Sequence, residues 1–67
     1  MITEIGIVAG EIWHLLDKKN SMPLDTIVDS LHHNRDLVLM SLGWLAREGH
    51  VTVAPTERGL VATLNKK

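Results

Sequence analysis

Three arginines are the side chains of this sequence best suited to bind phosphate groups. Arg35, Arg47 and Arg58 each carry a guanidinium group, whose rigid fork of N–H donors matches phosphate oxygens. Each has an acid as its neighbour in the chain, in turn Asp36, Glu48 and Glu57. The net charge is −1 at pH 7 and the pI is near 6.4, whereas a dedicated nucleic-acid-binding domain more often has a pI above about 9. The charge pattern therefore predicts only a weak attraction for phosphate.

The four histidines could also do chemistry, but their spacing does not favour a metal site. His32 and His33 are adjacent and point apart, while His14 and His50 lie far away in the chain. No pair has the i, i+4 spacing that places two ligands on one helix face. The chain contains no cysteine, and no cluster of carboxylates accompanies the histidines. We expect solvated or capping histidines, no bound metal and no disulfide.

Catalysis is not indicated by any motif in the sequence. The chain has no nucleophile–base pairing signature and no glycine-rich loop that would hold a phosphate. A chain of 67 residues leaves little room for a substrate pocket. Without Phe or Tyr it is also poorly equipped to stack RNA bases. We expect that the protein is not an enzyme and binds no cofactor.

Length and hydropathy predict a single small domain over residues 1–67. The hydrophobic fraction is 45%, which favours a folded core over disorder. No apolar run approaches the roughly 18 residues that a membrane span needs. The N-terminal segment "MITEIG" carries an acid where a signal peptide would carry Lys or Arg. We therefore expect a cytoplasmic protein that does not contact a membrane.

The first half of the chain predicts two helices separated by a short extended segment. Thr3 is expected to cap a helix that runs to Lys18 or Lys19, with Glu4 favourably placed at its positive end. The apolar stripe of this helix is Ile5, Val8, Ala9, Ile12, Leu15 and Leu16. Pro23 ends the helical region, "MPL" is extended, and Asp25 is expected to cap a second helix, "DTIVDSL".

The second half predicts a third helix followed by a hairpin. After the turn "HHN", Asn34 is a favourable cap for a helix whose apolar face holds Val38, Leu42, Leu45 and Ala46. Gly49 ends this helix, since the left-handed position after a helix prefers glycine. "HVTVA" and "LVATLN" alternate like strands, and "PTERG" between them is expected to be a turn. The expected core is Ile5, Val8, Ile12, Leu15, Ile27, Val28, Leu31, Val38, Leu42, Leu45 and Val51.

This order of elements resembles the winged helix-turn-helix. Winged-helix proteins commonly end their third helix with the pattern Val-x3-Leu-x2-Leu-x3-Gly-x-Val, which is matched here by Val38, Leu42, Leu45, Gly49 and Val51. The segment "LGWLAREGHV" is also similar to a small bacterial family of stand-alone winged-helix domains of unknown function. The resemblance implies an α+β, mainly α fold. It has three helices, a short strand before the second helix and a C-terminal β-hairpin wing.

The resemblance also implies binding of duplex DNA, as in a transcription regulator. The third helix would lie in the major groove and the hairpin loop beside the backbone. In such a complex, the side chains that contact DNA from the third helix and the hairpin loop would be Asn34, Arg35, Arg47 and Arg58. We expect weak binding, because three phosphate contacts give a salt slope of only about 3.

The outer face of the third helix favours an alternative, a protein-interaction module that binds no DNA. This face holds Asp36, Leu39, Met40, Gly43 and Arg47, with Trp44 at its flank. Bases are read mainly by Arg, Lys, Asn and Gln, and large apolar side chains fill the middle of this face instead. Gly43 suggests that something approaches the helix closely. We expect Trp44 to fold back onto the hairpin. Leu39 and Met40 could either cover the second helix or bind a partner.

A second apolar strip is expected on the first helix. It holds Ile2, Gly6, Gly10 and Trp13 beside the core stripe. Two glycines four residues apart allow a close approach, either by the wing strands or by a second subunit. Both alternatives stay open, and the second predicts a symmetric homodimer.

Overall fold

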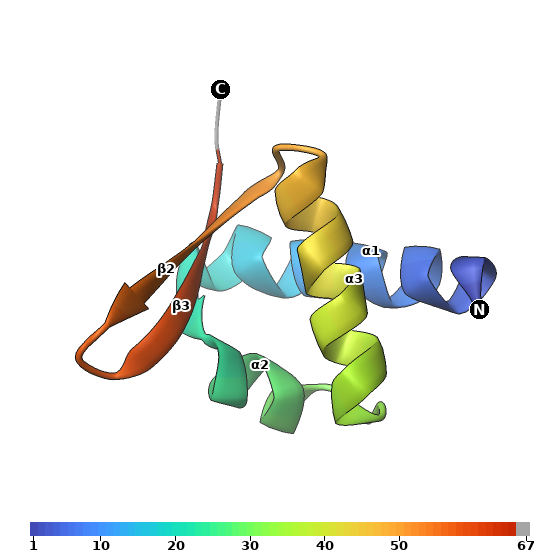
Figure 1. Cartoon of the computed structure of the whole chain (residues 1–67), viewed down its shortest axis with the longest axis horizontal. Coiled ribbons are helices and arrows are strands. Elements are labelled where there is room, and N and C mark those ends of the chain that lie inside the picture. Colours follow the sequence, from blue (N-terminus) through green and yellow to red (C-terminus); the bar gives the residue numbers. More distant parts are fainter. Residues whose placement is uncertain (66–67) are drawn as a thin grey trace.

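The part of the chain that the structure describes contains three helices and a three-stranded antiparallel sheet (Figure 1). The computed structural model describes residues 1–65. In chain order the elements are α1 (Ile2–Lys19), β1 (Ser21–Pro23), α2 (Leu24–Ser30), α3 (Arg35–Arg47), β2 (Val51–Thr56) and β3 (Gly59–Leu64). The α+β, mainly helical class, the short strand before α2 and the C-terminal hairpin are all confirmed.

The sheet has the order β1-β3-β2, so the last strand lies between the other two. β1 pairs with β3 from Ser21↔Thr63 to Pro23↔Val61, and β2 pairs with β3 from Val51↔Leu64 to Thr56↔Gly59. The hairpin projects on one side of the molecule, and the N-terminal end of α1 projects on the opposite side (Figure 1). These two ends carry the two candidate surfaces described below.

The wing tip is shorter than the segment "PTERG" predicted. Only Glu57 and Arg58 form the turn, because Pro55 and Thr56 belong to β2. Proline is tolerated there because β2 is an edge strand. The Thr56 hydroxyl donates to the Gly59 carbonyl at 2.8 Å and accepts from the Arg58 amide at 3.1 Å. Gly59 has a φ of 93°, a left-handed conformation that suits glycine.

Two of the predicted helix caps are wrong. α1 begins at Ile2, so Thr3 lies inside its first turn, and the N-terminal ammonium group pairs with Glu4 Oε1 at 3.0 Å. α2 begins at Leu24, directly after Pro23, whose extended backbone is fixed by pairing with Val61. Asp25 therefore lies in the first turn of α2 and makes no cap.

Both predicted ends of α3 are confirmed. The Asn34 side-chain oxygen accepts hydrogen bonds from the amides of Asp36 (2.7 Å) and Leu37 (3.3 Å). These bonds satisfy two of the free donors at a helix start. Gly49 has a φ of 82°, and the amide of His50 bonds to the Leu45 carbonyl at 3.0 Å. α3 is thus held at both ends by local interactions.

The core lies where α1, α3 and the sheet meet. Its buried apolar residues are Val8, Ala9, Ile12, Leu16, Met22, Ile27, Val38, Leu42, Leu45, Val51, Ala62 and Leu64. Ser41 is also fully buried and donates to the Leu37 carbonyl at 2.8 Å. Seven of the predicted core residues are confirmed, and Met22, Ala62 and Leu64 join them from the sheet.

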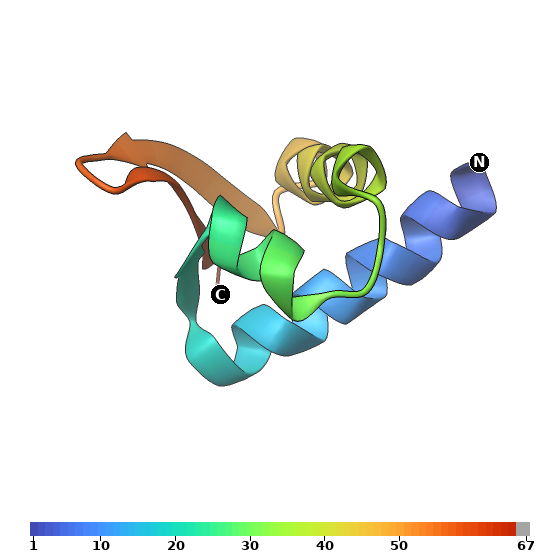
Figure 2. The same ribbon diagram turned by 90° about the horizontal axis from the view of Figure 1, so that it is seen from below.

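Four predicted core residues are only partly buried. Leu15, Val28 and Leu31 pack against the edge of the core, because α2 is short and covers only part of it. Ile5 is half-buried and lies outside the core cluster. The reason is visible in Figure 2, where the N-terminal end of α1 extends beyond α2 and the hairpin.

Candidate functional site

The outer face of α3 is exposed and apolar in its middle, as the helical pattern predicts. Met40 is 44% exposed and Trp44 is 47% exposed, while Leu39 is half-buried. Asp36, Gly43 and Arg47 are all exposed. A Cβ atom at Gly43 would meet nothing within 4 Å, so no other part of the described chain approaches this glycine. The face carries few groups that could read base edges.

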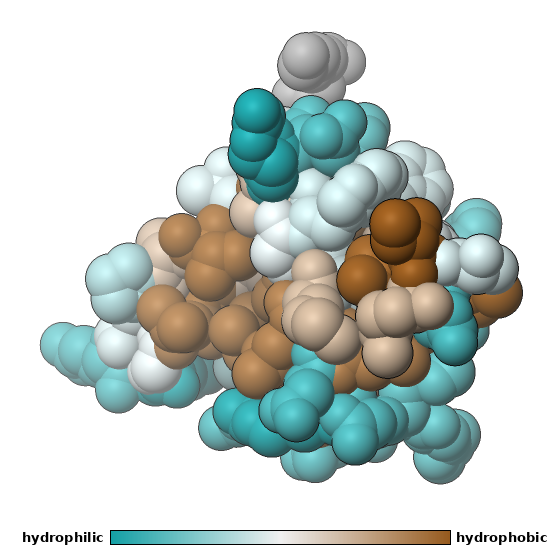
Figure 3. All heavy atoms as spheres, turned by 45° about the vertical axis from the view of Figure 1, so that its right-hand side comes forward, coloured by the Kyte–Doolittle hydropathy of each residue, from teal (hydrophilic) through white to brown (hydrophobic). Residues whose placement is uncertain are grey.

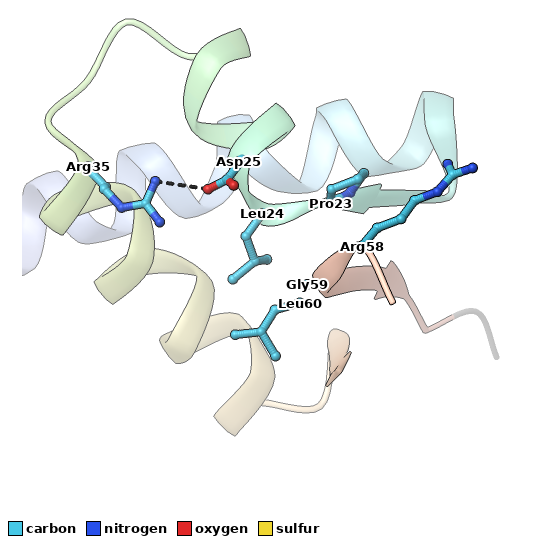
Figure 4. Close-up of a pocket in the computed structure, with 7 residues that line it drawn as sticks. All are labelled: Pro23, Leu24, Asp25, Arg35, Arg58, Gly59 and Leu60. Carbon is cyan, nitrogen blue, oxygen red and sulfur yellow. Dashed lines mark hydrogen bonds and ion pairs between the residues drawn. The ribbon is translucent and has the colours of Figure 1, made fainter. Parts of the chain in front are cut away.

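Arg35 and Arg58 border the same part of the surface although 22 residues separate them in the chain. They line one hollow of about 200 Å³, called here the wing hollow, between the start of α3, the start of α2 and the hairpin (Figure 4). Its other lining residues are Pro23, Leu24, Asp25, Gly59 and Leu60. In Figure 4, Leu24 and Leu60 lie between the two arginines. In the same view the Arg58 side chain extends away from Arg35, so the wing hollow has one arginine at each end of a small apolar surface.

Arg35 is paired with an acid that the sequence did not point to. Its Nη1 atom donates to Asp25 Oδ1 at 3.1 Å. The neighbour in the chain, Asp36, had been the expected source of negative charge. Both partners are exposed, with 56% of the Arg35 side chain and 81% of the Asp25 side chain accessible to solvent. Such a pair contributes little to stability, so the guanidinium group can exchange its partner.

The other two predicted DNA contacts are placed differently. Asn34 directly precedes Arg35, but its side-chain oxygen is committed to the cap of α3, which leaves its NH2 group as a donor. Arg47 is the last residue of α3. It lies about 18 Å along the helix from Arg35, given a rise of about 1.5 Å per residue. Of the four predicted contacts, only Arg35 and Arg58 line the wing hollow.

A second hollow lies at the other end of the molecule, between α1 and α3. The N-terminal hollow is lined by Ile2, Ile5, Gly6 and Trp44 and has a volume of about 280 Å³. The expected packing of Trp44 on the hairpin is wrong, since its neighbours in this hollow all belong to α1. Figure 3 shows apolar residues across this side of the molecule, with polar residues above and below them.

The glycines of α1 are not contacted by the wing strands, so that one of the two alternatives is wrong. A Cβ atom at Gly6 or Gly10 would meet nothing within 4 Å. Trp13, further along the same strip, is 37% exposed and lies edge-on to the His14 ring at 5.6 Å. At the helix start, the N-terminal ammonium group hydrogen-bonds Glu4 and lowers the pKa of its carboxyl group.

The histidines form no metal site within residues 1–65. No group of three potential ligands is found in this part of the chain. His33 Nε2 lies 3.1 Å from Glu11 Oε1, a contact between the turn before α3 and α1 that the sequence did not indicate. None of the helices described above is both long and apolar enough to cross a membrane.

Comparison with known proteins agrees with this architecture. Residues 1–64 match the family described as "Winged helix-turn-helix domain (DUF2582)". An uncharacterized protein of Methanocaldococcus jannaschii, MJ1608, is 35% identical over 63 residues, which cover 91% of this chain and 90% of that protein. The winged helix-turn-helix is a DNA-binding-like fold whose members are typically not enzymes. The chain therefore belongs to the winged helix-turn-helix domain family DUF2582.

Proposed function

We propose that residues 1–67 form one winged-helix domain that binds duplex DNA weakly, without catalytic activity, through phosphate contacts at the wing hollow. The observation that carries this proposal is the position of Arg35 and Arg58 at the two ends of one hollow beside the start of α3. In this fold the third helix and the wing face the duplex together. Asn34 and Arg47 would add one contact each.

The Arg35–Asp25 pair is compatible with phosphate binding. Because both side chains are exposed, their ion pair is worth at most about 1 kcal/mol. A phosphate oxygen offers Arg35 the same kind of acceptor and adds the release of counterions from the DNA. Asp25 therefore lowers the affinity of the site for phosphate but does not prevent phosphate from binding.

Several features support low affinity and little sequence preference. The middle of the outer α3 face presents Met40, Gly43 and Trp44, which offer few polar atoms to base edges. The wing contributes a single arginine beside Glu57. If binding rests on about three phosphate contacts, the logarithm of the binding constant should fall with the logarithm of the salt concentration with a slope of about −2.7.

Removing both arginines tests the proposal. At low salt, Arg35→Ala combined with Arg58→Ala should weaken binding to a random duplex at least about tenfold, because two of the three arginine–phosphate contacts are lost. The matched control is Lys18→Ala combined with Lys19→Ala, which removes the same charge from the end of α1. Equal losses in the two double variants would show that only net charge matters and would contradict a site at the wing hollow.

Asp25→Asn should act in the opposite direction. It frees the Arg35 guanidinium group and removes one negative charge, so binding to the same duplex should become stronger. Asp29→Asn makes the same charge change on α2, away from the wing hollow. Asp29→Asn should give only the small gain in DNA affinity that the change in net charge produces, whereas Asp25→Asn should give a larger gain. Fluorescence anisotropy with a labelled duplex measures the difference.

A second candidate function is a protein-interaction module that uses the outer face of α3. The exposure of Met40 and Trp44 favours it, since exposed apolar side chains on one helix face commonly contact a partner. Saturable binding of a protein partner that Met40→Glu abolishes, together with no DNA affinity at low salt, would establish this function in place of the first.

A further inference from the structure

We propose that the apolar surface between Arg35 and Arg58 packs against a sugar of the bound strand, and that Leu60 thereby makes the domain prefer a DNA duplex to an RNA duplex. The inference deepens the proposed function and rests on it, because it needs a nucleic acid at the wing hollow. It adds the chemical class of that nucleic acid, which contains 2′-deoxyribose in place of ribose.

Leu60 lies on the core-facing side of the sheet but beyond the core. Side chains two residues apart on a strand share a face, so Leu60 shares a face of β3 with Ala62 and Leu64. Ala62 is fully buried and Leu64 is 6% exposed, whereas Leu60 is 49% exposed. The reason is visible in Figure 2, where the hairpin extends past α2 and α3. About half of the Leu60 side chain is therefore left uncovered within the described part of the chain.

Leu24 continues this apolar surface on α2. It is half-buried and packs against the core, which fixes its position. Leu24 and Leu60 both line the wing hollow and lie between the two arginines (Figure 4). Among the described residues that line the hollow, Asp25 is the only side-chain acceptor, and it bonds to Arg35 at one end. A hydroxyl group placed over the two leucines would find no side-chain partner between the arginines.

The covalent structure of a nucleic acid decides which of its groups lies over the leucines. The backbone alternates phosphates and sugars, so a strand whose phosphates bind both Arg35 and Arg58 must place at least one sugar between them. The hollow has a volume of about 200 Å³, below the roughly 300–1,000 Å³ of pockets that enclose a whole ligand. It can receive the edge of a sugar that the two flanking phosphates hold in place. Since every nucleotide carries the same sugar, this contact adds no sequence preference.

DNA and RNA differ at the 2′ carbon of that sugar. In DNA this carbon carries only hydrogen and can pack against a leucine without losing a hydrogen bond. In RNA it carries a hydroxyl group, which is both a donor and an acceptor and is the group by which proteins tell the two apart. Burying a hydroxyl group without a partner weakens binding by roughly fivefold or more. The leucine surface therefore favours DNA.

Three duplexes of the same length and base sequence test the proposal at low salt. They carry deoxyribose, ribose and 2′-fluoro sugars, of which the last keeps the A-form shape of RNA but lacks the hydroxyl group. By fluorescence anisotropy, the dissociation constant for RNA should be at least about fivefold larger than that for DNA. The 2′-fluoro duplex should bind more like DNA than like RNA. If it bound as weakly as RNA, helix shape would explain the preference and the proposal would be overturned.

Substitutions of Leu60 locate the source of the preference. Leu60→Ser should lower the ratio of the RNA to the DNA dissociation constant towards one, because a serine hydroxyl can pair with the 2′-hydroxyl group. Leu60→Met keeps an apolar side chain and should keep the ratio. Both constants are measured on the same sample, so a loss of folded protein changes them equally and leaves their ratio unaffected.

The matched control is Ile7→Ser. Ile7 is 58% exposed on α1 and does not line the wing hollow, so this change should keep the ratio. An unchanged ratio in Leu60→Ser, or an equal decrease in Ile7→Ser, would contradict a role for Leu60.

The outcomes also separate this inference from the proposed function. If the unmodified protein bound DNA and RNA equally, or RNA more tightly, and Arg35→Ala combined with Arg58→Ala still weakened binding, the phosphate site would stand and the sugar contact would be wrong. If the unmodified protein bound neither duplex at low salt, both proposals would fail.

Discussion

The wing hollow and the N-terminal hollow differ in chemistry more than in size. Their volumes are about 200 and 280 Å³. The wing hollow has two arginines and one aspartate in its wall, whereas the N-terminal hollow has no ionisable group. Charge attracts phosphate over a distance, and an apolar recess gains free energy only on contact. The two ends of this small fold therefore offer different chemistry, a charged surface at the wing and an apolar recess at the start of α1.

α3 connects the two regions, because Arg35 at its start lines the wing hollow and Trp44 near its end lines the N-terminal hollow. Its buried face, which includes Leu42 and Leu45, holds the helix against α1 and the sheet. A change in that buried face should therefore disturb both ends together, whereas surface changes should affect one end only.

The largest effect is expected for Leu45→Ala. Leu45 is 3% exposed, and a cavity at such a site costs about 2–5 kcal/mol of the free energy of unfolding. Urea denaturation measures this loss. Leu60→Ala removes the same atoms from the hairpin, where Leu60 is 49% exposed, and should cost much less. If the two variants were equally stable, the assignment of the buried face of α3 would be wrong.

A smaller effect is expected at the helix caps. Asn34→Ala removes the oxygen that accepts from Asp36 and Leu37, and it should cost about 0.5–2 kcal/mol. Thr3→Ala, at the residue that the sequence had suggested as the cap of α1, should cost nothing measurable because Thr3 lies inside the helix. Thermal unfolding of both variants checks the difference, and a loss at Thr3 as large as that at Asn34 would contradict it.

The smallest effect separates the two regions by charge. Gly43→Lys adds a cation to the outer face of α3, and Gly10→Lys adds one to the strip on α1. Both glycines have open space around them, so neither substitution should strain the fold. Only Gly43→Lys should increase the salt slope of DNA binding, by about 1. An equal increase for Gly10→Lys would mean that DNA does not distinguish the two ends.

The sequence was a reliable guide where a local rule decides the structure. Asn34 and Gly49 are recognisable because a helix start needs an acceptor and its end a left-handed residue. The buried face of α3 followed from its helical spacing in the same way. The short wing was misjudged, because Pro55 is a turn residue in most settings and is tolerated here only by an edge strand.

The candidate sites depend on contacts that no local pattern reveals. Arg35 pairs with Asp25, ten residues earlier, because α2 and α3 bring their first turns together. Ile5 continues the core stripe of α1, but the elements that would cover it do not reach that far. The position of Trp44 against α1 likewise follows from how α1 and α3 cross. Tertiary packing decides all three.

A titration of the unmodified protein with a random DNA duplex at two salt concentrations tests the central claim most directly. At about 150 mM salt the dissociation constant should be larger than roughly 10⁻⁴ M, the weak end of the range for ordinary non-specific binding. A tenfold reduction in salt should strengthen binding by roughly 500-fold or more, since about three phosphate contacts are expected. Micromolar binding at the higher salt concentration, or no binding at the lower one, would contradict the account.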